Sequence, residues 1–272
     1  AGVQRGEFKP VNISIVAQVL LGMMDWARLW STKTDEGAEV IVSRRTIYPS
    51  IIIDILLRGV ATDRNYTLVN PRDLITVTAR DFNAFNIQDI SEEKRLQLIG
   101  TASRLFNQLG IEATSVDDVA TALGATKGAV YHYFKNKNQL LMACYERAFD
   151  LYDQLIETSE NSQNNPLDVM LTVMHLNCQA QLSRYPPLIL QSNPFSLPSG
   201  YTQNVLKISH RSHKVLIAAF EQGLCRHDDL TVIDVSVGAF FWVQKWANEN
   251  QFANPMLLAD EVCSIYACGI SV

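Results

Sequence analysis

The feature that most constrains the fold is a pair of short helices joined by a glycine-containing turn. Thr114 or Ser115 can cap the first helix, because a side-chain oxygen at that position accepts from a backbone N–H of the first turn. Gly124 breaks this helix, and Thr126 caps a second one that runs through Phe134. Two short helices with such a turn in about 20 residues form a helix-turn-helix.

The rest of the chain is also predicted to be helical. Apolar residues recur at helical spacing, capping residues precede these runs, and glycine or proline follows them. Strand signals are scarce, so we expect an all-α fold. The expected helices, apart from the two short ones, cover residues 91–109, 137–158, 166–183, 201–224, 231–249 and 256–270.

Composition narrows the class of protein further. The chain has 272 residues, 47% of them hydrophobic, with a formal net charge of −5. This composition supplies a core and excludes wholesale disorder. No apolar run approaches the roughly 20 residues of a membrane span. The five cysteines form no CxxC pair, which favours reduced thiols in a cytoplasmic protein without a membrane partner.

Charge is unevenly distributed along the chain. Residues 148–272 carry six basic and twelve acidic side chains, whereas the segment Thr126–Lys137 holds three lysines and no acid. The same segment contains Tyr131, His132 and Tyr133. A basic and aromatic patch on an acidic protein is typical of a phosphate-binding surface. The alternative is a solvated helix end, which charge alone does not exclude.

The region from Leu98 to Leu141 resembles the DNA-binding domain of the TetR family of bacterial transcriptional repressors. The resemblance runs without a gap and implies a three-helix DNA-binding domain followed by a helical ligand-binding and dimerisation domain. The matching residues are Ala102, Leu105-Phe106, Gly110, Ala113-Thr114-Ser115-Val116, Asp118-Val119-Ala120, Gly124, Thr126 to Phe134, Lys137 and Leu140-Leu141.

This resemblance implies a double-stranded DNA operator as the partner. The second short helix would enter the major groove, with its hydroxyl, cation and exposed N-terminus near phosphate. Gly128 and Ala129 would allow close approach of the backbone, while Val130, Tyr133 and Phe134 would belong mainly to the core. The expected DNA-binding residues are Thr114, Ser115, Thr126, Lys127, Gly128, Ala129, Tyr131, His132 and Lys137.

The first 60 residues resemble a later part of the same chain. Three segments match in the same order, with few identities, which indicates an internal repeat. The matched pairs are Gly2-Val3-Gln4-Arg5 with Gly223-Leu224-Cys225-Arg226, Gly22–Trp26 with Trp242–Trp246, and Pro49–Gly59 with Pro255–Gly269.

In the TetR family the last two long helices form the dimer interface. The repeat therefore suggests a tandem protein, in which residues 1–60 hold the C-terminal helices of a first unit, at residues 11–30 and 49–59. Residues 61–90 would be a linker, 91–147 the DNA-binding domain, and 148–272 the effector-binding and dimerisation domain. We expect either an intrachain pseudo-dimer or a homodimer through these helices. The alternative is an N-terminal extension that merely packs on the domain.

The family resemblance also implies a pocket for a hydrophobic small-molecule effector within residues 148–272. An apolar stripe on a helix is more often core than pocket, so each assignment competes with a packing role. The candidate lining residues are Met170, Met174, Cys178, Leu182, Phe195, Leu206, Phe220, Phe241 and Trp242.

These patterns favour a ligand-responsive DNA-binding repressor without a cofactor. One alternative is a sensing or interaction module with weak DNA binding, because an operator is bound by two DNA-binding domains and this sequence holds one. Another is a metal-responsive regulator, in which His175, Cys178, His210 and His213 would bind zinc. An enzyme is not expected, because no phosphate-binding glycine loop, nucleophile elbow or HExxH pair occurs.

Overall fold

The computed structural model describes residues 2–30, 38–79, 82–189, 199–247 and 254–272. Within these ranges the regular elements are helices, accompanied by two isolated β-bridges. The fold is all-α, as predicted. The helices are α1 (Ile13–Trp30), α2 (Ala38–Arg58), α3 (Leu74–Val77), α4 (Ile87–Leu109), α5 (Val116–Ala122), α6 (Lys127–Tyr133), α7 (Lys137–Ser162), α8 (Pro166–Gln181), α9 (Ser199–Glu221), α10 (Leu230–Phe241), α11 (Val243–Trp246) and α12 (Pro255–Cys268).

Side-chain caps set most of these boundaries. Ser115 and Asp118 form a reciprocal capping box at the start of α5, and Asn136 and Asn165 cap α7 and α8. Some predicted boundaries are wrong, and the predicted helix over 231–249 is two helices, α10 and α11. Helix α4 begins at Ile87 rather than near Ser91, because Asn86 accepts the backbone N–H of Gln88 and caps the helix earlier.

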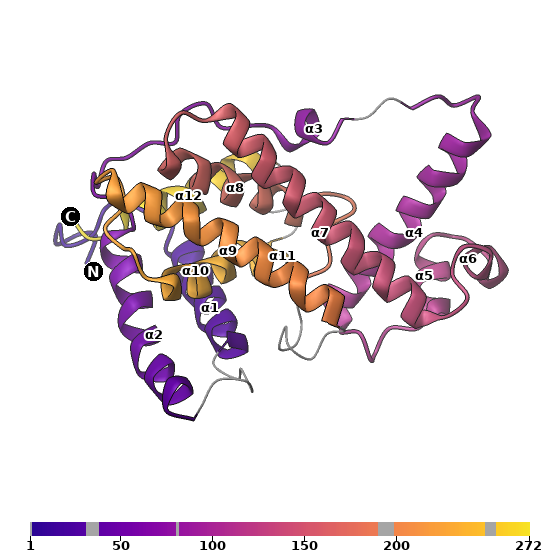
Figure 1. Cartoon of the computed structure of the whole chain (residues 1–272), viewed down its shortest axis with the longest axis horizontal. Coiled ribbons are helices and arrows are strands. Elements are labelled where there is room, and N and C mark those ends of the chain that lie inside the picture. The colour runs from indigo at the N-terminus through magenta and orange to yellow at the C-terminus, as the bar shows by residue number, and fades with distance from the viewer. Residues whose placement is uncertain (1, 31–37, 80–81, 190–198, 248–253) are drawn as a thin grey trace.

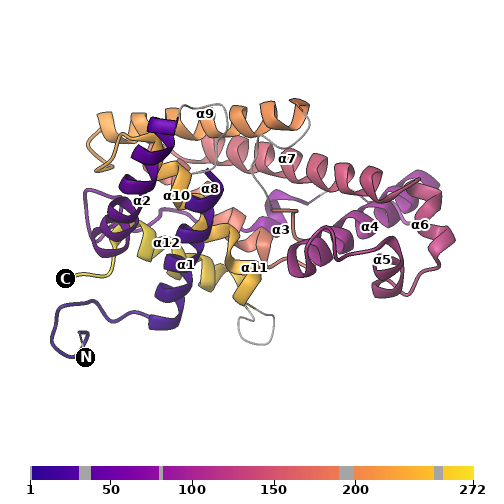
Figure 2. The same ribbon diagram turned by 90° about the horizontal axis from the view of Figure 1, so that it is seen from below.

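The molecule is elongated, with α4, α5 and α6 at one end and both chain termini at the other (Figures 1 and 2). The long helix α7 joins the two ends and packs against α4, α8 and α9. In the part of the chain that the structure describes, no helix combines the length and apolar character needed to cross a bilayer.

The N-terminal helices α1 and α2 pack against α10 and α12. Helices α1 and α10 touch through their backbones at Gly22 and Gly238. A Cβ atom at either glycine would collide with the carbonyl oxygen of the other. The contact is mirrored in the neighbouring side chains, since the Cβ of Trp242 lies against Gly22 and that of Trp26 against Gly238.

The ends of α2 and α12 show the same mirrored relation. After α2, the backbone N–H of Val60 donates to Tyr266 O at 3.0 Å. After α12, the N–H of Ile270 donates to Leu56 O, also at 3.0 Å. Gly59 and Gly269 both have positive φ, of 72° and 64°, and each lies against the backbone of the other segment. The two chain segments thus cross in equivalent ways.

The structure changes the register of the internal resemblance in two places. Trp26, not Gly22, is the counterpart of Trp242, because the Cβ of each tryptophan lies against the glycine of the other helix. Gly6, not Gly2, is the counterpart of Gly223, because both have positive φ and each precedes a segment with the mirrored bonds. Lys9 N–H donates to Ile270 O, and Arg226 N–H donates to Val60 O, both at 2.8 Å. Helix α2 also begins at Ala38 and contains Pro49 internally, so the expected start at Pro49 is wrong.

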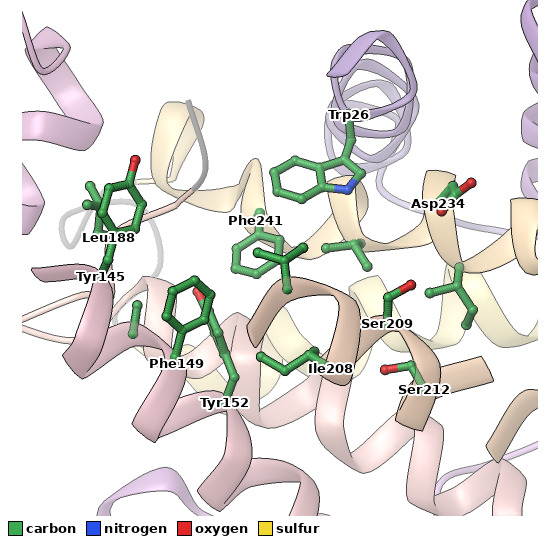
Figure 3. Close-up of a pocket in the computed structure, with 14 residues that line it drawn as sticks. Trp26, Tyr145, Phe149, Tyr152, Leu188, Ile208, Ser209, Ser212, Asp234 and Phe241 are labelled. Atoms are coloured by element: carbon green, nitrogen blue, oxygen red, sulfur yellow. The ribbon is translucent and has the colours of Figure 1, made fainter. Parts of the chain in front are cut away.

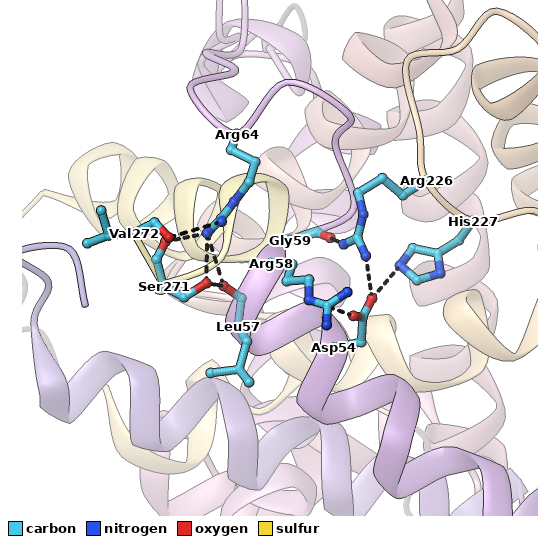
Figure 4. A network of polar contacts seen from close by, with 9 residues as sticks. All are labelled: Asp54, Leu57, Arg58, Gly59, Arg64, Arg226, His227, Ser271 and Val272. Atoms are coloured by element: carbon cyan, nitrogen blue, oxygen red, sulfur yellow. Dashed lines mark hydrogen bonds and ion pairs between the residues drawn. The ribbon is translucent and has the colours of Figure 1, made fainter. Parts of the chain in front are cut away.

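Polar contacts join the N-terminal segment to the rest of the chain (Figure 4). Arg226 donates to the Asp54 carboxylate at 2.9 Å and to Gly59 O at 2.6 Å. Arg64 donates to the carbonyl oxygens of Leu57 and Ser271. Both arginines bind backbone carbonyls at the crossing, which gives the contact directional as well as apolar character.

The connection between α2 and α4 lies along α8. Gln179 on α8 donates to Arg72 O at 2.9 Å and accepts the N–H of Leu74 at 3.0 Å. The same amide contacts the buried His175, whose Nε2 lies 3.0 Å from Asp260 on α12. A buried polar chain therefore links the connection, α8 and α12.

The α1–α10 crossing predicts that Gly238→Ala destabilises the fold. The added methyl group has no room against the Gly22 backbone, so we expect a loss of about 1–3 kcal/mol in the free energy of unfolding. Urea unfolding measures this loss. The control is Gly200→Ala in α9, where a Cβ meets nothing within 4 Å. An equal effect of both substitutions would contradict the crossing.

His175 predicts a loss of stability in mild acid. Burial lowers its pKa below the ordinary value, and this effect outweighs the opposing contact with Asp260. The unfolded chain, with a histidine pKa of about 6.5, then binds the proton more readily than the folded chain. The contribution of His175 to the free energy of unfolding is therefore fully present above a pH of about 6.5 and is lost as the pH decreases. At a pH of about 5.5 the loss is at most about 1.4 kcal/mol.

The measurement is urea unfolding at these pH values, compared between the natural chain and His175→Gln. We expect the substitution to reduce the pH dependence, because glutamine does not titrate. The pKa of His227 is also lowered, first by burial and then by Arg226, so a smaller slope should remain. An unchanged slope in His175→Gln would rule out the assigned role of His175.

Candidate DNA-binding head and effector pocket

Helices α4, α5 and α6 form a compact head at one end of the molecule (Figure 1). Val130 and Phe134 are buried, with 0% and 3% of their surface exposed, and Tyr133 packs partly against the same core. Their burial fixes the orientation of α6. The side chains on its other face, including Tyr131 and His132, are exposed.

The start of α6 presents several groups suited to phosphate. Thr126 caps the helix, and its hydroxyl accepts the N–H of Ala129 at 3.2 Å. Lys127 reaches back to Asp117 on α5, with 2.9 Å between Nζ and Oδ2, and lies 5.8 Å from the Tyr131 ring centroid. Hydrogen bonding to Asp117 raises the pKa of Lys127, so the cation is maintained at this surface.

Lys137 stands on the neighbouring helix and donates to the carbonyl oxygen of Glu112 at 3.3 Å. Together with Thr126, Lys127, Gly128 and Ala129, it lies at the surface of the head. Gly128 and Ala129 are exposed and small, so α6 offers little steric bulk at its first turn.

Thr114 and Ser115 have different positions despite being neighbours. Ser115 is exposed and caps α5. Thr114 is 1% exposed, and its hydroxyl donates to Gly110 O at 2.9 Å. The Thr114 side chain therefore lies inside the domain at the end of α4, whereas Ser115 is at the surface.

A cavity of about 650 Å³, including its opening, lies between α7, α9 and α10 (Figure 3). A second cavity of about 750 Å³ adjoins it and shares Tyr152, Ile208 and Phe241 with the first. The walls are mainly aliphatic and aromatic, with a few polar groups from Ser209, Ser212, Asp234 and Asn177. Such a lining suits an apolar ligand.

The cavities include three of the nine predicted lining residues, namely Met170, Met174 and Phe241. The other described candidates lie elsewhere. Cys178 is buried away from both cavities, and Leu182 contributes to the core. Leu206 and Phe220 are 43% and 41% exposed.

Trp242 lies at the α1 side, where its indole Nε1 donates to Gln18 Oε1 at 3.3 Å, and it does not line either cavity. Phe195 falls outside the described residues.

Sequence reasoning missed the aromatic wall on α7. Tyr145, Phe149 and Tyr152 recur at helical spacing and line the first cavity. Their periodicity is visible in the sequence, but it does not distinguish a cavity wall from core. It also missed Trp26, which comes from α1 and stacks on Phe241 with ring centroids 5.0 Å apart. Only the tertiary contact of α1 with α10 brings this residue to the cavity.

The histidine and cysteine pairs do not converge on a metal-binding geometry. His175 contacts Gln179 and Asp260, while Cys178 is fully buried and burial raises its pKa to about 12. No group of three or more potential ligands occurs within the described ranges.

Comparison with known proteins finds matches to the head. Residues 98–144 match the sequence model of "Bacterial regulatory proteins, tetR family". The chain is 42% identical to the transposon Tn10 TetC protein of Escherichia coli over 67 residues, which cover 25% of this chain and 34% of TetC. It is 25% identical to the probable acrEF/envCD operon repressor of E. coli (strain K12) over 189 residues, or 63% of this chain and 86% of the repressor.

The fold is also shared with a solved regulator. Apo AibR superposes with a TM-score of 0.51 and 25% identity, over 64% of this chain and 99% of AibR. By contrast, the chain spans only 34% of the length of TetC and 39% of the length of the regulator TtgR of Pseudomonas putida. Residues 98–144 therefore match the tetR family of bacterial regulatory proteins, and about two thirds of the chain shares the fold of AibR.

Proposed function

We propose that the chain is a ligand-responsive, DNA-binding transcriptional repressor of TetR type. The observation that carries this proposal is the exposed face of α6, with Thr126 and Lys127 at its start and Tyr131 on the same surface. Two similar proteins support it. One is a probable operon repressor, and AibR has been solved with isovaleryl coenzyme A and operator DNA.

The effector would act through α7. This helix starts beside α6 in the head, and its middle carries Tyr145, Phe149 and Tyr152 along the cavity. A ligand that moves this aromatic wall would tilt a helix packed against α4. The head would then shift relative to the rest of the molecule, which changes affinity only if the two positions bind DNA differently.

We also propose that the N-terminal segment forms a pseudo-dimer with the effector domain. Helices α1 and α2 cover α10 and α12 through mirrored contacts, and AibR in full occupies only 64% of this chain. In this view residues 1–60 are the last helices of a first unit and 61–90 the linker. Residues 91–147 are the DNA-binding domain, and 148–272 the effector domain.

The DNA-binding proposal predicts that Lys127→Ala and Lys137→Ala each weaken binding to every DNA sequence. Each lost phosphate contact should lower the slope of log affinity against log salt by about one. Tyr131→Ala should weaken binding without unfolding the head, because its ring is 42% exposed. Fluorescence anisotropy with labelled duplexes, measured at several salt concentrations, provides the affinities.

The matched control is Lys207→Ala. Lys207 is also an exposed lysine paired with an aspartate, 2.9 Å from Asp153, but it lies on α9. Its removal should leave the salt slope unchanged. If all three head variants bind as the natural chain does, or if Lys207→Ala has the same effect as Lys127→Ala, the head is not the DNA-binding surface.

A further inference from the structure

We propose that Trp26, from the N-terminal segment, recognises the effector by donating its indole N–H to an acceptor oxygen on an uncharged, largely apolar ligand. This inference rests on the proposed function, because it treats the cavity between α7, α9 and α10 as the effector site. It adds a residue from outside the effector domain and a chemical class for the ligand.

Trp26 is held firmly at the cavity wall. The residue is 6% exposed, and its ring stacks on Phe241 at an interplanar angle of 20°. Its Cβ lies against Gly238, where any side chain would exclude it. Figure 3 shows the indole beside Phe241, with its nitrogen on the edge turned toward Asp234.

The indole N–H of Trp26 is buried and has no hydrogen-bond partner in the described part of the chain. A buried donor without a partner is costly, and such groups are rare in folded proteins. An acceptor on a ligand in the cavity would satisfy this donor.

The mirrored contact of α1 with α10 shows where a partner for the Trp26 N–H would be expected. Trp242 is the counterpart of Trp26, since each lies one helical turn after its glycine. The N–H of Trp242 donates to Gln18, one turn before Gly22. The residue equivalent to Gln18 is Asp234, but its carboxylate accepts the Tyr48 hydroxyl at 3.2 Å. The bond is thus made by Trp242 and absent at Trp26, the tryptophan that lines the cavity.

The lining defines the ligand class. Among the described residues around the cavity there is no lysine, arginine or histidine, while Asp234 contributes a carboxyl group. An anion would find no counter-charge, so a carboxylate ligand is disfavoured. Aromatic rings of Trp26, Phe241 and Tyr152 suit a flat apolar body. A ketone or ester oxygen would supply the acceptor.

The test titrates the full chain with three naphthalenes of similar size. These are 2-acetylnaphthalene, which has a carbonyl acceptor, 2-ethylnaphthalene, which has none, and the anion 2-naphthoate. Isothermal calorimetry should give a dissociation constant for the ketone about three- to tenfold lower than for the hydrocarbon, as expected for one hydrogen bond. The naphthoate should bind most weakly.

Two matched variants locate the bond. Trp26→Phe should remove the advantage of the ketone over the hydrocarbon, whereas Trp242→Phe, which loses the equivalent indole on the other side, should keep it. The infrared carbonyl stretch of the bound ketone should lie lower in the natural chain and Trp242→Phe than in Trp26→Phe. This spectroscopic reading separates a lost bond from a merely altered cavity shape.

The proposal is overturned if the ketone has no advantage in the natural chain or keeps it in Trp26→Phe. It is also overturned if both variants lose the advantage equally, or if none of the three compounds binds. DNA affinity of the same proteins is measured in parallel. Absence of DNA binding in the natural chain, together with the expected ketone result, would contradict the proposed function while leaving ligand recognition by Trp26 intact.

Discussion

The contact of two helix backbones at Gly22 and Gly238 is the constraint on which the rest of the arrangement depends. Only glycine permits helices to approach so closely, and the contact brings α1 across α10. This crossing buries apolar surface of both helices, aligns the mirrored ends of α2 and α12, and delivers Trp26 to the cavity. A side chain at either glycine would separate the N-terminal segment from the pocket.

Two parts of the chain connect the pocket to the head. Helix α7 carries the aromatic wall of the cavity and begins at the head, while the connection after α2 lies along α8 and leads to α4. The head is therefore joined to the body both by a helix and by a tethered segment. Helix α7 therefore provides a continuous packed route from the pocket to α4.

Local features explain why much of the head could be predicted from the sequence. Ser115, Thr126 and Asn136 cap their helices through side-chain bonds to backbone within a few residues, and such signals are readable without tertiary information. The assignment of Thr114 required the structure, because its hydroxyl partners lie at the end of the preceding helix. The direction of that side chain follows from packing.

The pocket depends on contacts between distant segments, which explains why fewer of its residues could be predicted. Cys178 and Met174 lie on the same helix and are both apolar, yet only Met174 faces the cavity. The internal resemblance was likewise detectable, but its register at Gly6 required the mirrored hydrogen bonds and backbone dihedral angles. The two segments share few identical residues even where their backbone geometry is the same.

The central claim is that one chain supplies both sides of the crossing between α1–α2 and α10–α12. Spin labels at Leu21→Cys and Leu257→Cys, both at exposed positions, measure it by double electron–electron resonance, since the five native cysteines are buried. The account predicts a defined distance that persists, with unchanged modulation depth, when labelled chain is diluted tenfold with unlabelled chain. A distance that disappears on dilution would show that α1 and α2 of one molecule pack on another, and would contradict the intrachain arrangement.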